Sequence, residues 1–286
     1  MTAAPRLTSL HRGRLTFAVH DAGPADGPPV VLLHGFPEDS SSWSRVVPLL
    51  HDAGLRTVAL DQRGYSPGAR PGARAAYRLE HLVADVGALL GATGPAHVVG
   101  HDWGGNVAWA LSAWAPERVR SLTVLSTPHP RALARSLVRS DQALRSLYVG
   151  FFQVPAVPEA VLRRWLAPAL ERTGLPAPDA ARYAARLGDP AALRGILGWY
   201  RALPLARTRV GDVEVPTTYV WGARDVALGR VAAEATERHV RAPYRFVALD
   251  ANHWLPETEP DEVAAAVVRQ VTATAPGSAG EGASGG

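Results

Sequence analysis

The chain has 286 residues, of which 47% are hydrophobic and 20% charged, a balance typical of a folded protein with a core large enough to need no disulfides. It contains no cysteine, which excludes disulfides, thiolate metal sites and a cysteine nucleophile. All 30 basic residues are arginine, the net charge is only +4, and the arginines are scattered along the chain, which argues against nucleic-acid binding.

Targeting and cofactor signals are absent from the sequence. No apolar segment follows Met1-Thr2-Ala3-Ala4-Pro5-Arg6, so we predict no signal peptide. No apolar run approaches the length of a membrane-spanning helix, and no histidine pair has zinc-ligand spacing. We expect a cytoplasmic protein without metal, organic cofactor, nucleic-acid or membrane partner, existing as a monomer or a homodimer.

Short apolar segments along the chain predict β-strands. Leu7 to Val19 contains two partly alternating segments around Gly13, which favours a hairpin. Val30-Val31-Leu32-Leu33 is a continuous apolar run, as in a strand buried on both faces. Further strands are predicted at residues 57–60, 97–99, 122–125, 218–221 and 244–249.

Helical patterns alternate with these strands, at residues 43–51, 79–90, 103–115, 231–239 and 262–271. This alternation predicts an α/β protein with a mainly parallel sheet covered on both faces. Residues 130–209 contain no strand pattern, and we interpret them as a helical cap over the carboxyl ends of the strands, where such sheets bind ligands. The core then comprises residues 1–129 and 210–275, and the Gly- and Ser-rich tail 276–286 is expected to be disordered.

The segment Gly100-His101-Asp102-Trp103-Gly104-Gly105 has the G-x-Nu-x-G form of a nucleophile elbow, with Asp102 in the place of the usual serine. An aspartate could merely cap the following helix. Its position between an apolar strand and a helix instead favours a nucleophile. A carboxylate can open an epoxide or displace a halide, which leaves an alkyl ester on the enzyme.

A histidine is needed to activate water against that ester. Elbow enzymes place nucleophile, acid and histidine in that order along the chain. Of the ten histidines, only His253 follows the last predicted strand, in a loop before a helix. We therefore assign it as the base. His239 lies within a predicted helix and is expected to be a surface residue.

The orienting acid should follow the penultimate strand, and Asp225 is the first carboxylate there. It would hold the imidazole of the base and stabilise its charged form. An ion pair with Arg224 or Arg230 is the alternative role. Asp250 is a weaker candidate because it lies only three residues before the histidine.

Backbone N–H groups must stabilise the negative charge that develops during hydrolysis of the ester. The N–H of Trp103, directly after the nucleophile, is one candidate. The second is the N–H of Phe36 in His34-Gly35-Phe36-Pro37-Glu38, the loop after the first apolar run. We predict that these two groups form an oxyanion hole.

These motifs together resemble the α/β-hydrolase superfamily and, within it, the soluble epoxide hydrolases. The loop at residues 34–38, the elbow, and the late Asp225 and His253 carry the resemblance, which spans Leu15 to Val271. It implies the α/β-hydrolase fold, a mostly parallel central sheet with helices on both faces and an inserted helical cap.

The resemblance also implies two cap tyrosines that hydrogen-bond the epoxide oxygen and protonate it. Tyr148, in Ser146-Leu147-Tyr148-Val149-Gly150-Phe151-Phe152-Gln153, is similar to the first, and Tyr200, in Gly198-Trp199-Tyr200-Arg201, to the second. A phenol stays protonated at neutral pH and can donate. Core packing is the alternative role for either residue. Tyr183 has no matching surroundings.

Two loops depart from the family pattern. Ser66-Pro67 stands where a second glycine is usual, and Ser126-Thr127-Pro128-His129-Pro130 lacks the usual asparagine. We interpret both as scaffold loops that leave the triad untouched but alter the shape of the pocket.

The sequence therefore predicts an epoxide hydrolase that converts a small-molecule epoxide to a vicinal diol through an ester on Asp102. A haloalkane dehalogenase uses the same nucleophile, but Phe36 stands where such enzymes often carry asparagine, and two cap tyrosines have no role there. A non-catalytic ligand-binding protein on the same scaffold is a second alternative. A serine esterase is disfavoured because no serine occupies the elbow.

Overall fold

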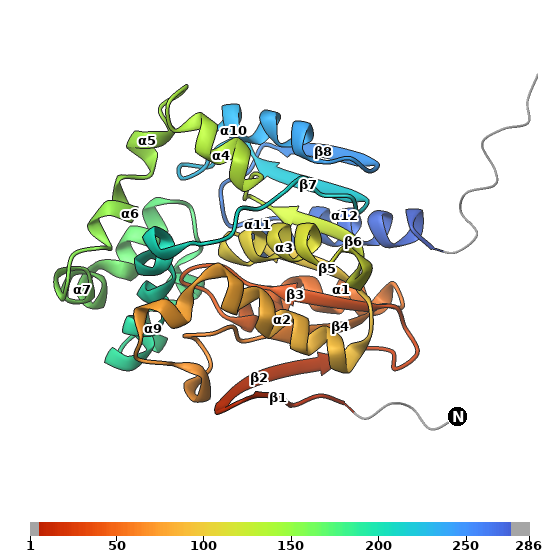
Figure 1. The fold of residues 1–286 in the computed structure, drawn as a ribbon, viewed down its shortest axis with the longest axis horizontal. Helices are drawn as coiled ribbons and strands as arrows, with labels where there is room; N and C mark the ends of the chain where they lie inside the picture. Colours follow the sequence, from red (N-terminus) through yellow and green to blue (C-terminus); the bar gives the residue numbers. More distant parts are fainter. Residues whose placement is uncertain (1–5, 276–286) are drawn as a thin grey trace, which may run out of the picture.

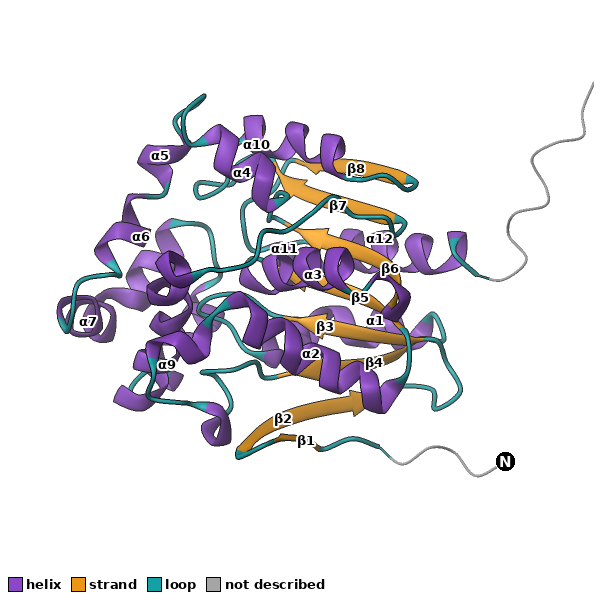
Figure 2. Cartoon of the chain, in the orientation of Figure 1, coloured by secondary structure: helices purple, strands orange, loops and turns teal. Residues whose placement is uncertain are grey.

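The computed structural model describes residues 6–275, so the predicted disordered tail at 276–286 lies outside the described residues. These form one eight-stranded sheet with helices on both faces (Figures 1 and 2). The strand order is β1-β2-β4-β3-β5-β6-β7-β8. β1 and β2 pair antiparallel, β2 is antiparallel to β4, and the remaining pairs are parallel. The strands are β1 Ser9–Arg12, β2 Leu15–Ala22, β3 Pro29–Leu33, β4 Arg56–Leu60, β5 Ala96–His101, β6 Val119–Leu125, β7 Thr217–Gly222 and β8 Tyr244–Leu249.

The apolar run of β3 is explained by burial of both sheet faces. Successive side chains of a strand point to opposite faces. Val31 and Leu33 accordingly belong to a core cluster that includes residues of α2 and α3, whereas Val30 and Leu32 belong to a second cluster with residues of α1 and α12. The α/β-hydrolase architecture expected from the sequence is therefore present.

Helices follow most of the parallel strands, as the alternating pattern predicts. The core helices are α1 Val46–Asp52, α2 Leu79–Thr93, α3 Trp103–Trp114, α10 Arg230–Ala235, α11 Leu255–Thr258 and α12 Pro260–Ala273. The predicted helix at 231–239 ends in a 3-10 turn, Thr236–His239. No helix within residues 6–275 combines the length and apolar character needed to cross a membrane.

Helices alone fill the chain between Pro130 and Ala202, with no strand among these described residues. They are α4 Pro130–Ser136, α5 Gln142–Arg145, α6 Leu147–Phe151, α7 Val157–Arg172, α8 Ala177–Arg186 and α9 Pro190–Ala202. Figure 2 places α6, α7 and α9 beyond the carboxyl ends of the parallel strands. This is also the end of the sheet where the elbow lies.

Candidate active site

Asp102 occupies the sharp turn between β5 and α3. Its backbone has φ 47° and ψ −118°, in the left-handed half of conformational space that side chains other than glycine seldom adopt. Gly104 permits this turn, because a Cβ there would collide with the carbonyl of Leu33 in the neighbouring strand β3. The main-chain carbonyl of Asp102 accepts a hydrogen bond from Thr127 Oγ1 at 2.7 Å. The strained position is thus held by the close approach of α3 to β3 and by Thr127.

The loop after β3 contacts the carboxylate directly. The Phe36 N–H donates to Oδ1 of Asp102 at 2.8 Å. Trp103 is the first residue of α3, so its N–H belongs to the set that a helix leaves without internal partners. The Phe36 amide therefore contacts the carboxylate directly, and the Trp103 amide follows it in the chain at the start of α3.

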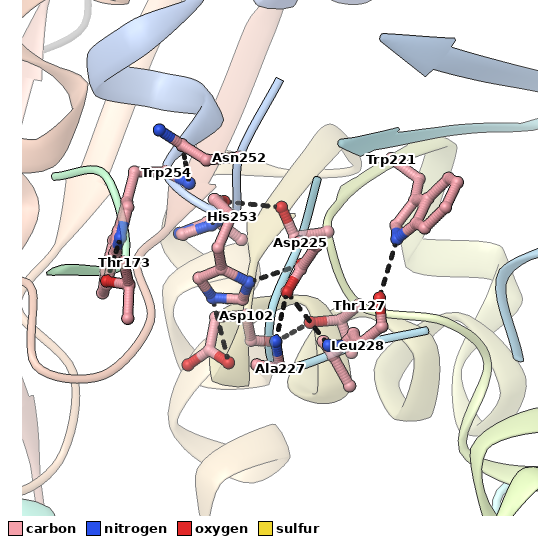
Figure 3. Close-up of polar contacts among 12 residues, drawn as sticks. Asp102, Thr127, Thr173, Trp221, Asp225, Ala227, Leu228, Asn252, His253 and Trp254 are labelled. Atoms are coloured by element: carbon pink, nitrogen blue, oxygen red, sulfur yellow. Dashed lines mark hydrogen bonds and ion pairs between the residues drawn. The ribbon is translucent and has the colours of Figure 1, made fainter. Parts of the chain in front are cut away.

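His253 and Asp225 meet Asp102 from the loops that follow β8 and β7 (Figure 3). Nδ1 of His253 lies 2.7 Å from Oδ2 of Asp225, and Nε2 lies 3.7 Å from Oδ2 of Asp102. The other oxygen of Asp225 accepts from the N–H groups of Ala227 and Leu228 at 2.7 and 2.9 Å. The Asp225 carboxylate is therefore held in place by the backbone of its own loop as well as by the imidazole.

The alternative partners considered for Asp225 are engaged elsewhere. Arg224 pairs with Asp250, whose side chain is 85% exposed, and Arg230 pairs with Glu234. Asp250 is thus excluded as the residue that holds the imidazole in this conformation.

The surroundings of His253 favour its charged form. Burial lowers the pKa of the imidazole, but the charge and hydrogen bond of Asp225 and the charge of Asp102 outweigh this effect and raise the pKa to about 9. Part of this increase depends on the charge of the nucleophile.

The two predicted tyrosines lie together above the elbow. Tyr148 on α6 and Tyr200 on α9 have ring centroids 5.8 Å apart, and Tyr200 packs edge-on against Trp103 and Phe36 with centroids 5.1 Å apart in each case. Tyr200 is 3% exposed; Tyr148 is 37% exposed, although its hydroxyl end is buried. Burial raises the pKa of both phenols, and the negative charge of Asp102 raises them further. Both tyrosines therefore remain neutral hydrogen-bond donors.

Tyr183 is placed differently. It is fully buried, and its hydroxyl donates to Oε1 of Glu257 at 2.6 Å. It is absent from the cavity that contains the other two tyrosines.

A cavity of about 610 Å³ connects the carboxylate to the tyrosines. Asp102, Tyr148 and Tyr200 all line it, and its wall beyond them is mostly apolar. The apolar wall is built by residues of α4 and the position after it, α5, the 3-10 turn after α9 and the loop after β7, among them Leu133, Leu137, Ala143, Leu203 and Leu228. Apolar pockets with a few convergent polar groups are typical of small-molecule sites.

A buried polar network behind the triad was not predicted from the sequence. Glu38 is fully buried, contacts Nδ1 of His101 and accepts from the Gly35 N–H at 2.8 Å. Nε2 of His101 in turn lies 2.9 Å from the main-chain carbonyl of His253. Both residues stand inside motifs identified in the sequence, but the network joins the loop after β3, the end of β5 and the loop after β8.

Two sequence interpretations need correction. The loop at 126–130 is more than a scaffold, because Ser126 Oγ donates to the carbonyl of His253 at 2.7 Å and Thr127 contacts Asp102 and lines the cavity. His239 is not a surface residue: it is 3% exposed and stacks on His129 with ring centroids 4.7 Å apart. The 3-10 turn that contains His239 packs against α4, and its stacking partner His129 is the residue before α4.

Comparison with known proteins places the chain in a family. Residues 28–260 match the family described by the alpha/beta hydrolase fold. The AB hydrolase superfamily protein YfhM of Bacillus subtilis is 37% identical over 260 residues, which cover 86% of this chain and 91% of that protein. Epoxide hydrolase A of Mycobacterium tuberculosis is 33% identical over 305 residues, covering 89% and 93% of the two chains.

Solved structures give the same result. The crystal structure of epoxide hydrolase A from Mycobacterium thermoresistibile superimposes with a TM-score of 0.73 at 30% identity, covering 92% of this chain and 97% of that one. A structure described among novel epoxide hydrolases from metagenomes of hot environments gives a TM-score of 0.80 at 27% identity, covering 95% and 99%. The chain belongs to the α/β-hydrolase fold family and is similar to members of that family named epoxide hydrolases.

Proposed function

We propose that the protein is an epoxide hydrolase that forms a covalent ester on Asp102. The observation that carries this proposal is the shared cavity in which the Asp102 carboxylate faces Tyr148 and Tyr200. A nucleophile on one side and two neutral phenols on the other match the two ends of the carbon–oxygen bond that must break. In this proposal residues 130–209 act as the cap that supplies the phenols.

The first step opens the ring. Oδ1 of Asp102 is hydrogen-bonded to Phe36, so the freer Oδ2 attacks the less hindered epoxide carbon. The carbon–oxygen bond breaks, and the oxygen takes a proton from the tyrosine pair. The products of this step are a hydroxyalkyl ester and a phenolate, which His253 reprotonates from its charged form through solvent.

The second step needs a neutral His253, and ester formation provides one. The charge of Asp102 helps to hold the pKa of His253 at about 9, so the loss of that charge lowers the pKa. The neutral imidazole removes a proton from water, and the oxygen of that water adds to the ester carbonyl carbon. The oxyanion forms at Oδ1, next to the N–H groups of Phe36 and Trp103. Collapse releases the diol and restores the Asp102 carboxylate and the charged His253.

Isotope labelling tests this route. A single turnover with enzyme in excess, in water enriched in heavy oxygen, should place the label in Asp102 first, because water attacks the carboxyl carbon. Peptide mass spectrometry reads the label. Label that enters the diol directly in the first turnover would contradict the ester mechanism.

Two further measurements separate the alternatives. Asp102→Asn should abolish diol formation, since an amide is a far weaker nucleophile; turnover in neither parent nor variant would support a non-catalytic binding protein. Halide release from bromoalkanes at a rate exceeding epoxide turnover would support a dehalogenase instead.

A further inference from the structure

We infer that Asn106 is a specificity-determining residue that hydrogen-bonds an oxygen-bearing substituent of the epoxide. This inference rests on the proposed function and names the class of substrate. The Asn106 amide lies in a mostly apolar cavity wall, at a backbone position fixed relative to the nucleophile.

Asn106 lies one helical turn after Asp102. Its main-chain N–H donates to the Asp102 carbonyl at 3.1 Å, and four residues advance an α-helix by about 6 Å. Residues four apart share one face of a helix, and both residues line the same cavity. The carboxamide therefore borders the same cavity as the attacking carboxylate, about one helical turn further along the chain.

The carboxamide is free to bind a ligand. Within residues 6–275, neither its oxygen nor its nitrogen makes a hydrogen bond to protein, although the residue is half-buried. The other polar side chains of the wall are engaged: Thr127 Oγ1 donates to the Asp102 carbonyl, and Ser146 Oγ accepts from Gln142 Nε2 at 3.1 Å. A polar group in an apolar wall needs a partner from water or ligand.

The chemistry of the amide and its surroundings define the ligand. A carboxamide both donates and accepts, so an ether, hydroxyl or carbonyl oxygen suits it. Because Asn106 lines the same cavity one helical turn after Asp102, that oxygen should lie a few bonds from the attacked carbon. The apolar side chains of Leu133, Leu137 and Leu228 line the same cavity. The expected substrates are epoxides with an oxygen close to the ring and a bulky apolar group beyond it.

A matched pair of substrates isolates this contact. Phenyl glycidyl ether and 4-phenyl-1,2-epoxybutane differ by an oxygen in place of one CH₂ group. The ratio of kcat/KM for the two is measured in the parent and in Asn106→Leu, so that intrinsic reactivity cancels. We expect Asn106→Leu to lower kcat/KM for the ether about 3- to 10-fold, the usual effect of one neutral hydrogen bond, and to leave the hydrocarbon substrate unchanged or improved.

Two more variants complete the experiment. Asn106→Ala gives the same readout if leucine disturbs α3, and Ser146→Ala tests the other polar side chain of the wall. A ratio that is unchanged in both Asn106 variants, or that changes with Ser146→Ala instead, overturns the assignment while diol formation still supports the proposed function. If the parent turns over neither epoxide, the proposed function itself fails.

Discussion

Nδ1 of His253 lies 2.7 Å from Oδ2 of Asp225, a distance that leaves the imidazole little freedom to rotate. The opposite nitrogen, Nε2, is 3.7 Å from the Asp102 carboxylate, which leaves space for the ester to form. The acid thus holds the base at a fixed position on one side, and a gap separates the base from Oδ2 of the nucleophile on the other.

This relationship predicts a change in the titration of His253. Asp225→Asn removes the largest effect that raises the pKa of His253, so the pKa should fall well below about 9. NMR of the labelled imidazole measures it. The pKa of His253 in the folded protein lies above its unfolded value of 6.5, so the charged imidazole stabilises the folded state by up to about 3 kcal/mol. This stabilisation is fully present below pH 6.5 and is lost as the pH rises through about 9.

Asp225→Asn should also slow hydrolysis of the ester on the order of 10²- to 10⁴-fold, as expected when the orienting acid of a triad is lost. The ester on Asp102 should therefore accumulate. Asp250→Asn is the matched control, because that carboxylate is exposed and, among residues 6–275, pairs only with Arg224. An equal loss of activity in both variants would contradict the role of Asp225.

The tyrosine pair predicts slower ring opening when either phenol is lost. Tyr148→Phe and Tyr200→Phe should each lower the rate of ester formation by about 10²-fold, since general acid catalysis typically contributes that much or more. Pre-steady-state fluorescence of the neighbouring Trp103 measures this step.

Tyr183→Phe provides the control within the same segment. It removes a buried hydrogen bond to Glu257 and should lower the unfolding free energy by about 1 kcal/mol without slowing ring opening. A slowed ring opening in Tyr183→Phe equal to that of the other two variants would show that the effect comes from packing of the segment.

The buried contact between Glu38 and His101 predicts that the folded protein becomes less stable when the negative charge of Glu38 is removed. Burial raises the pKa of Glu38, but His101 outweighs this effect and lowers it. Glu38→Gln removes the charge that stabilises this pair and should lower the free energy of unfolding by about 1–3 kcal/mol. Urea unfolding at neutral pH measures it. Glu117→Gln, at a side chain that is 71% exposed, should change stability little; comparable losses in both would refute the argument.

The stacked pair of His129 and His239 predicts that the folded protein loses stability in acid. Burial lowers the pKa of His129 to about 4 and also lowers that of His239. Because the folded pKa of His129 lies below the unfolded value of 6.5, its contribution is fully present above pH 6.5 and is lost as the pH falls toward 4. His129→Asn should therefore weaken the dependence of Tm on pH between 6.5 and 4. A pH dependence identical to that of the parent would count against this pair.

The sequence predicted the sheet well because burial on both faces leaves continuous apolar runs. The run Val30–Leu33 falls within β3, and the elbow lies between β5 and α3 as expected. Residues 130–209 showed only helical composition, and the ends of α4 to α9 were not predictable from it. His101 and Glu38 were missed as partners because their contact joins the end of β5 to the loop after β3, 63 residues apart in the chain, a relation that no local pattern contains. His239 was misplaced for the same reason.

The helical segment between β6 and β7 separates the residues of the candidate active site into two groups along the chain. Asp102 and the Phe36 loop precede it, whereas Asp225 and His253 follow it. Neither half holds a complete set of reacting groups, yet the two halves share one parallel sheet through the pairing of β6 with β7. A chain cut in the turn between α7 and α8 would thus regain activity only by reassembly of its two fragments, which makes this fold a natural scaffold for a split reporter.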